Sequence, residues 1–113
     1  MSVEKTGNGA TALHIAAQNG HDAVVALLLK AGENVNASTY DGSTALMMAA
    51  QNGHRRVVWR LVEAGADVSR RKHVHATSAD GATALFMAAQ QGHNDIVEHL
   101  LSVGAASVPT TVR

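Results

Sequence analysis

The sequence predicts an all-α solenoid in which pairs of helices stack side by side, and three observations predict it. A block of 14 residues that begins at Asn8 returns at Asp41 and again at Asp80, and the first two copies are identical at 10 of 14 positions. Each unit holds two sets of apolar residues at helical spacing, separated by Gly-His. A unit of about 33 residues cannot bury two apolar stripes alone, so neighbouring units must cover each other.

The spacing of the blocks divides the chain into units of unequal length. Thr11 and Thr44 are 33 residues apart, whereas Thr44 and Thr83 are 39 apart, so six additional residues lie in the second interval. The expected parts are a tail at 1–6, a first repeat at 7–39, a second at 40–72, an inserted basic finger at 73–78 within an insertion of roughly 70–78, a third repeat at 79–108 and a tail at 109–113.

Each unit is expected to contain a turn followed by two helices. The first helix carries an apolar face with alanine pairs that let neighbouring helices approach closely: Leu13, Ala16 and Ala17; Leu46, Ala49 and Ala50; Leu85, Ala88 and Ala89. The second carries the bulkier stripe: Val24, Val25, Leu28 and Leu29; Val57, Val58, Leu61 and Val62; Ile96, Val97, Leu100 and Leu101. Each second helix ends near a glycine, which can close the last turn in a left-handed conformation: Gly32, Gly65 and Gly104.

Composition excludes several classes of function. The 113 residues are 46% hydrophobic and 16% charged, which predicts one folded domain. The net charge is zero, so no overall field attracts nucleic acid or anionic lipid. There is no cysteine, and the longest apolar run, 23–29, is too short to cross a membrane. We therefore expect an intracellular protein, cytoplasmic rather than nuclear, with no membrane partner.

The repeated pattern Gly-x-Thr-Ala-Leu-x-x-Ala-Ala-x-x-Gly-His, followed by Val-Val-x-x-Leu and Ala-Gly-Ala-Asp-Val, resembles the ankyrin repeat. The resemblance extends over residues 7–108 in three copies. Alanine stands where the family most often has proline in its Thr-Pro-Leu-His block, and Met47 and Phe86 replace the histidine that His14 retains. The resemblance also implies that the recurring histidines, His21, His54 and His93, tie successive units together by hydrogen bonds.

The resemblance implies a protein-binding scaffold with hairpin-like fingers, whose contacts come from the finger tips and the exposed side of the first helices. No nucleophile elbow or phosphate-binding glycine loop is present, so we expect no catalytic residues and no cofactor. His73 and His75 offer at most two metal ligands, so no metal is expected. Carried over by motif position, the expected partner-binding residues are Tyr40, Asp41, Ser43, Gln51, Asn52, Asp80, Gln90 and Gln91.

The insertion lengthens one finger and makes it basic. Its side chains are Arg70, Arg71, Lys72, His73 and His75. These charges would attract an acidic partner, more strongly below a pH of about 6.5, where histidine becomes charged. Two other interpretations stay open: a solvated loop extension, and weak nucleic-acid binding, since three phosphate contacts alone give only a modest salt dependence.

Trp59 lies beside the apolar stripe of its helix and is expected to be substantially exposed. Arg55 and Arg56 precede it by four and three residues, so either guanidinium can reach the indole. One interpretation is a second contact site on the convex side of the solenoid. The other is that the ring packs on its own helix under the arginine stems.

The end repeats keep their apolar stripes, although terminal repeats of a solenoid usually have a polar outer face. The charges are also uneven, because residues 53–75 are basic and residues 79–106 are acidic. An alternative function is therefore self-assembly, or stacking as a fragment of a longer array, through the uncapped ends or the opposed charged repeats.

Overall fold

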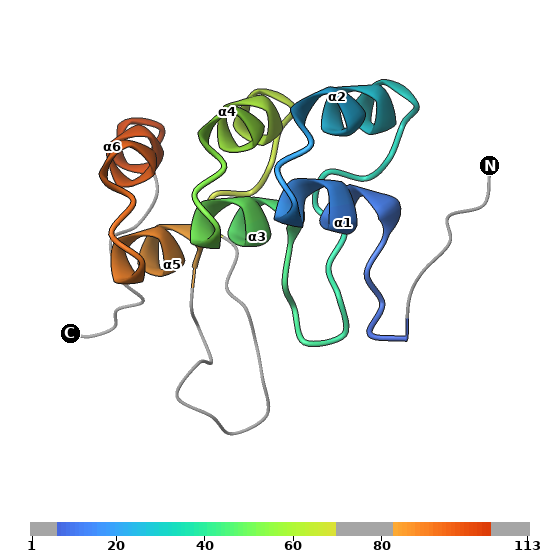
Figure 1. Ribbon diagram of the computed structural model, residues 1–113, viewed down its shortest axis with the longest axis horizontal. Coiled ribbons are helices and arrows are strands. Elements are labelled where there is room, and N and C mark those ends of the chain that lie inside the picture. The colour runs from blue at the N-terminus through green and yellow to red at the C-terminus, as the bar shows by residue number, and fades with distance from the viewer. Residues whose placement is uncertain (1–6, 70–82, 105–113) are drawn as a thin grey trace.

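Six α-helices build the part of the chain that the computed structural model describes, residues 7–69 and 83–104. They are α1 (Ala12–Gln18), α2 (Asp22–Lys30), α3 (Ala45–Gln51), α4 (Arg55–Glu63), α5 (Ala84–Gln90) and α6 (Asn94–Ser102). In Figure 1, α1, α3 and α5 form one row and α2, α4 and α6 form a second row above it. The predicted all-α solenoid of helix pairs is confirmed.

The threonine of each repeat explains where the first helix begins. Thr11, Thr44 and Thr83 stand at the N-cap, and their hydroxyl oxygens accept a hydrogen bond from the backbone N–H three residues later. In the second repeat this bond joins Met47 N to Thr44 Oγ1 over 3.2 Å. The cap satisfies one of the N–H groups that a helix leaves free at its start. Helices of only seven residues gain little stability by themselves, so packing between units must hold them.

The predicted apolar stripes merge into one core that runs through all three units. Leu46, Leu61 and Leu100 are essentially inaccessible to solvent, and the alanines of the first helices bring α1, α3 and α5 close together. Val24 departs from the predicted stripe, because 44% of its surface is exposed. The equivalent Val57 is buried, and its helix α4 packs against α2 of the unit before it. Position in the stack, rather than the helical pattern alone, therefore decides burial.

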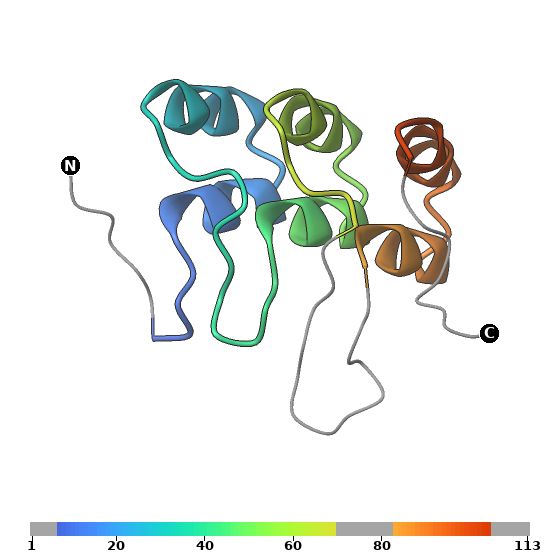
Figure 2. The same ribbon diagram turned by 180° about the vertical axis from the view of Figure 1, so that it is seen from behind.

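A finger formed by residues 37–44 joins the first and second units and projects away from the row of first helices (Figures 1 and 2). His14 on α1 anchors it. Its Nδ1 accepts a hydrogen bond from Thr11 N (2.9 Å), so the ring proton is on Nε2, which donates to Ala37 O (2.9 Å) and Ser43 O (3.2 Å). The buried imidazole thus fixes the finger relative to the helix.

Candidate protein-binding surface

Tyr40 lies at the tip of the 37–44 finger, and residues that precede α1 contact it. Its backbone N–H donates to Asn8 O over 3.1 Å, which joins the finger to the chain that leads into α1. Its ring lies directly over Gly9, where a Cβ atom would come within 2.9 Å of the ring carbons. The side chain nevertheless remains 71% exposed. The structure therefore presents a large aromatic ring to solvent on a backbone that hydrogen bonds keep in place.

Asp41 and Ser43 shape the turn of the same finger. Asp41 Oδ1 accepts hydrogen bonds from the hydroxyls of Thr39 and Ser43 and from the backbone N–H of Ser43. Asp41 is exposed, but Ser43 is buried with 8% of its surface accessible. The expectation that Ser43 is available to a partner is therefore wrong, because the Asp-Gly turn folds its hydroxyl back onto the aspartate.

A row of amide side chains lies at the ends of α3 and α5. Gln51, Asn52, Gln90 and Gln91 are all exposed. Asn52 is partly used within the protein, because its Nδ2 donates to Gln18 O over 3.2 Å. The side chains of Gln51 and Gln90 have no hydrogen-bond partner among the residues described, so their donors and acceptors face solvent. With Tyr40 they define what we call the concave surface: Tyr40, Asp41, Gln51, Asn52, Gln90 and Gln91.

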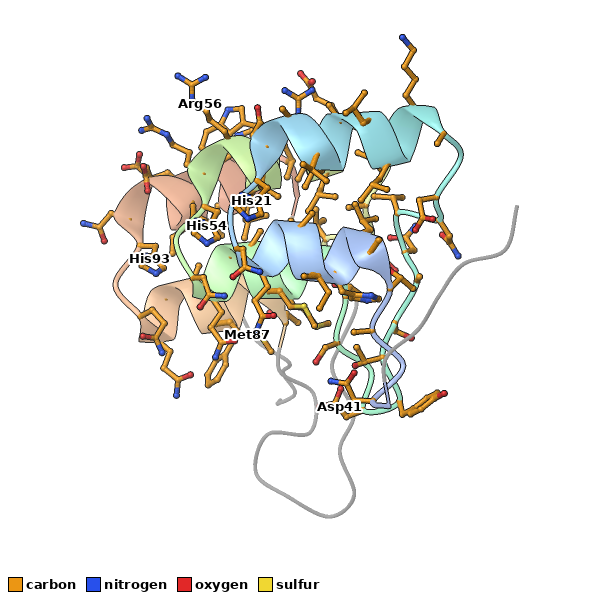
Figure 3. The ribbon with its side chains drawn as sticks, turned by 45° about the vertical axis from the view of Figure 1, so that its right-hand side comes forward. His21, Asp41, His54, Arg56, Met87 and His93 are labelled. Carbon is orange, nitrogen blue, oxygen red and sulfur yellow. The ribbon has the colours of Figure 1, made fainter. Side chains whose placement is uncertain are left out.

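Below this row the recurring histidines join one unit to the next. His54 Nε2 donates to Gln18 O over 2.9 Å, and His93 Nε2 donates to Gln51 O over 3.0 Å. Figure 3 shows the two rings in a row with His21, each in the turn between a first and a second helix. The expected hydrogen-bonding role is confirmed for His54 and His93. These bonds fix the spacing of the first helices and, with it, the spacing of the amides.

On the other side of the molecule, Trp59 makes a contact that its sequence position does not reveal. Its ring stacks on His99 of α6, with centroids 3.8 Å apart and planes inclined by 12°. Trp59 is partly buried and packs against the core, so the expectation of substantial exposure is wrong. His99 occupies the space that a partner would need on that face of the ring.

Two ion pairs also join the outer helices, and sequence analysis missed both. Arg60 holds Asp22 through two hydrogen bonds, Nε to Oδ1 at 2.7 Å and Nη2 to Oδ2 at 2.9 Å. This hydrogen bonding lowers the pKa of Asp22 and raises that of Arg60. Arg55 Nη1 lies 3.0 Å from Asp95 Oδ2 in a more exposed pair. Charges that differ between repeats are thus partly neutralised within one chain.

A shallow groove of about 460 Å³ lies beside these pairs, lined by Asp22, Arg55, Arg56, Trp59, Arg60 and Glu63. Arg56 is exposed and projects from the outer side of α4 (Figure 3). Within the part of the chain that the structure describes, its guanidinium has no ion-pair partner. The groove is the convex surface discussed below.

Six of the predicted contact residues lie outside the described ranges: Arg70, Arg71, Lys72, His73, His75 and Asp80. Their roles remain predictions from sequence. Among residues 7–69 and 83–104, no three His, Cys, Asp or Glu side chains cluster in a way that would hold a metal ion. None of the six helices has the length and apolar character that a membrane span requires.

Comparison with protein families identifies the repeats. A family model described as ankyrin repeats (3 copies) matches residues 1–72, and a single ankyrin-repeat model matches residues 80–110. No curated protein matches the chain. The two matches together cover all three units seen in the structure. The chain therefore belongs to the ankyrin-repeat family, a family of non-enzymatic modules that generally mediate protein–protein interaction.

Proposed function

We propose that this chain is a non-catalytic interaction module that binds a partner protein through its concave surface. The observation that carries the proposal is the exposed Tyr40 ring, which lies over Gly9 on a backbone that a hydrogen bond to Asn8 O holds. An aromatic side chain that is already ordered loses little conformational entropy on binding, and such residues dominate the energetics of many interfaces. Only 3% of the residues in this chain are aromatic, and one of them, Tyr40, is 71% exposed at a finger tip.

The amide side chains of the concave surface can donate and accept hydrogen bonds in defined directions. Gln51 and Gln90 occupy the same position in successive repeats, and each offers both a donor and an acceptor. Because histidine hydrogen bonds fix the distance between repeats, the two amides are set in advance for a partner with polar groups at matching intervals. A polypeptide segment that runs along the first helices satisfies that requirement, with an apolar side chain placed against Tyr40.

The convex surface is the alternative contact site. It offers Arg56 and the groove beside α4. Its other cations, Arg55 and Arg60, are engaged with aspartates of neighbouring repeats, and Trp59 is stacked on His99. A partner would have to displace these contacts or bind around them, which favours the concave surface.

The basic segment 70–75 supports a further proposal about the partner, namely that its contact region is acidic. This rests on sequence alone, as does the proposal that the protein acts inside the cell. Binding of nucleic acid through the same segment is the weaker alternative, because the chain as a whole carries no net positive charge.

Site-specific photocrosslinking tests the proposed surface. A photoreactive phenylalanine analogue is placed at Tyr40 or Gln51 on the concave surface, at Arg56 on the convex surface, and at the exposed Ala31 as a control. After irradiation in an extract of the source cells, we expect the same protein to be crosslinked from positions 40 and 51 and not from position 31. Crosslinking from position 56 alone, or from no position, would overturn the proposal.

A further inference from the structure

The first unit exposes residues whose counterparts in the third unit are covered. On α1 and α2, Ile15, Val24 and Leu27 are 42%, 44% and 66% exposed. Their counterparts in the third unit are Met87 and Ile96, which are buried, and His99, which stacks on Trp59 of the unit before. Together with Ala12 and His21, these three form what we call the upstream face: Ala12, Ile15, His21, Val24 and Leu27.

The third unit shows the converse pattern. Phe86 and Leu101 are 42% and 48% exposed, and Ala89 is also exposed. In the second unit, the counterparts of Phe86 and Ala89 are Met47 and Ala50, which the third unit covers completely. Phe86, Ala89 and Leu101 form what we call the downstream face. Inside the chain, a downstream face packs on an upstream face twice, between units one and two and between units two and three.

The histidine hydrogen bonds break off at the same two faces. His21 Nε2 has no partner among the described residues, although His54 and His93 each donate to a carbonyl of the preceding unit. The carbonyl at the opposite end, Gln90 O, receives no hydrogen bond from the residues described, although its counterparts Gln18 O and Gln51 O each accept one from a histidine of the following unit. Among the described residues, the upstream face therefore has a histidine donor without an acceptor, and the downstream face has a carbonyl acceptor without a donor.

In each unit a glycine precedes the histidine, and the surroundings of these glycines show that a histidine ring of a following unit has space at the downstream face. A Cβ atom at Gly20 would lie 2.6 Å from His54, and one at Gly53 would lie 2.8 Å from His93. At Gly92 a Cβ atom would meet no described residue within 4 Å. The space over a glycine that a histidine ring fills in the two internal junctions is therefore also present, over Gly92, at the downstream face of the third unit.

We propose that a second copy of this chain stacks head to tail on the first, with the upstream face of one copy on the downstream face of the other. His21 Nε2 then donates to Gln90 O of the second copy, and its ring lies over Gly92 as His54 lies over Gly20. The chain itself contains both halves of the interface and shows twice, at its internal junctions, that such halves fit.

The charges at these faces are compatible with this occupant. In the first internal junction Asp22 meets Arg60, whereas the positions that meet between copies carry Asn94 and Leu27, which are uncharged. Glu98 is the counterpart of Trp59, so in the same register it meets Leu27 of the other copy, and its exposed side chain places one carboxylate at the edge of the junction. Within residues 7–69 and 83–104, Glu98 is thus the one charge that this register brings next to Leu27, and the residues named for the two faces carry no Asp, Glu, Lys or Arg.

Because the two faces differ, the contact is heterologous and does not close after two copies. Each added copy repeats the same step, which leads to an open filament or, where the rotation closes, to a ring. Each junction also continues the row of amides from one copy into the next, since it keeps the spacing of an internal junction. Stacking would therefore lengthen the concave surface.

Two variants and their mixture test the proposal. Leu27→Glu places a negative charge on the upstream face, next to Glu98 of the other copy, and Leu101→Lys places a positive charge on the downstream face. Either charge would be desolvated in the junction, which weakens association about tenfold or more. Ala64→Lys is the matched control, because position 64 and its counterparts, Ala31 and Val103, are exposed in every unit. Analytical ultracentrifugation measures the mass from micromolar to millimolar chain, and circular dichroism confirms that each variant is folded.

We expect the parent and Ala64→Lys to exceed the mass of a dimer as concentration rises, and each face variant alone to stay a monomer. An equimolar mixture of the two face variants keeps one intact pair of faces and should stop at a dimer. A parent that stays monomeric at millimolar concentration would overturn the proposal, even if another protein covers these faces. So would a face variant that still dimerises with itself, since that result requires a symmetric contact.

Discussion

Replacing His54 or His93, which join two repeats, should lower the free energy of unfolding measurably. Replacing His21, the equivalent residue of the first repeat, should lower it little. In His54→Ala the bond from Nε2 to Gln18 O is lost, which costs about 0.5–1.5 kcal/mol for a neutral hydrogen bond. The ring also leaves its contact with Gly20, which adds roughly 0.5 kcal/mol of lost dispersion. Gln18 O keeps a second partner in Asn52 Nδ2, so no acceptor is left unsatisfied. We expect a total loss of about 1–2 kcal/mol.

The assay is urea denaturation followed by circular dichroism, at a concentration low enough to keep the protein monomeric. His93→Ala should behave like His54→Ala, whereas His21→Ala should change the free energy of unfolding by less than about 0.5 kcal/mol. A thermal scan should show the internal variants melting roughly 4–8 °C earlier. Equal losses at all three positions, or no loss at His54, would refute the role given to these bonds.

Three further predictions concern the core, the outer ion pair and the basic segment. Leu61→Ala should lower the free energy of unfolding by about 2–5 kcal/mol because Leu61 is fully buried, while the same change at Leu27, which is 66% exposed, should cost far less in urea denaturation. Since hydrogen bonding to Arg60 lowers the pKa of Asp22, the pair stabilises the fold above the unfolded-state pKa of about 3.9, and this contribution disappears as pH falls through the folded-state pKa. Asp22→Asn should therefore be less stable than the parent at neutral pH, and the two should converge in acid denaturation; a constant difference down to the lowest pH would contradict this. Deleting residues 70–75 restores the 33-residue spacing, so the circular dichroism spectrum should be retained while salt-sensitive binding to polyglutamate is lost; binding that survives the deletion would place the acidic contact elsewhere.

The helices and their order could be predicted from sequence because their determinants are local. The threonine caps, the spacing of the apolar residues and the Gly-His turns each act within a few residues, and they recur three times. The hydrogen-bonding role of His54 and His93 was also predicted, through the resemblance to ankyrin repeats. Tyr40 was predicted as a contact residue by motif position, but the support from Gly9 and Asn8 is visible only in the structure.

The contacts between second helices could not be predicted by considering each helix alone. The helical pattern around Trp59 describes only its own helix, whereas its stacking partner His99 lies one repeat later. Asp22 and Arg60 likewise come from different units, and the first residue of α2 meets the sixth of α4. Ser43 was misplaced because exposure was inferred from the finger as a whole, although the aspartate turn buries its hydroxyl.

The most direct test of the central claim compares one variant on each surface against the same crosslinked partner. Tyr40→Ala removes the aromatic ring of the concave surface, and Arg56→Ala removes an exposed cation of the convex surface; neither residue is buried. Isothermal titration calorimetry measures the affinity of both variants and of the parent for the purified partner. We expect Tyr40→Ala to weaken binding by about tenfold or more and Arg56→Ala to leave it unchanged. A loss of affinity confined to Arg56→Ala would contradict recognition through the concave surface.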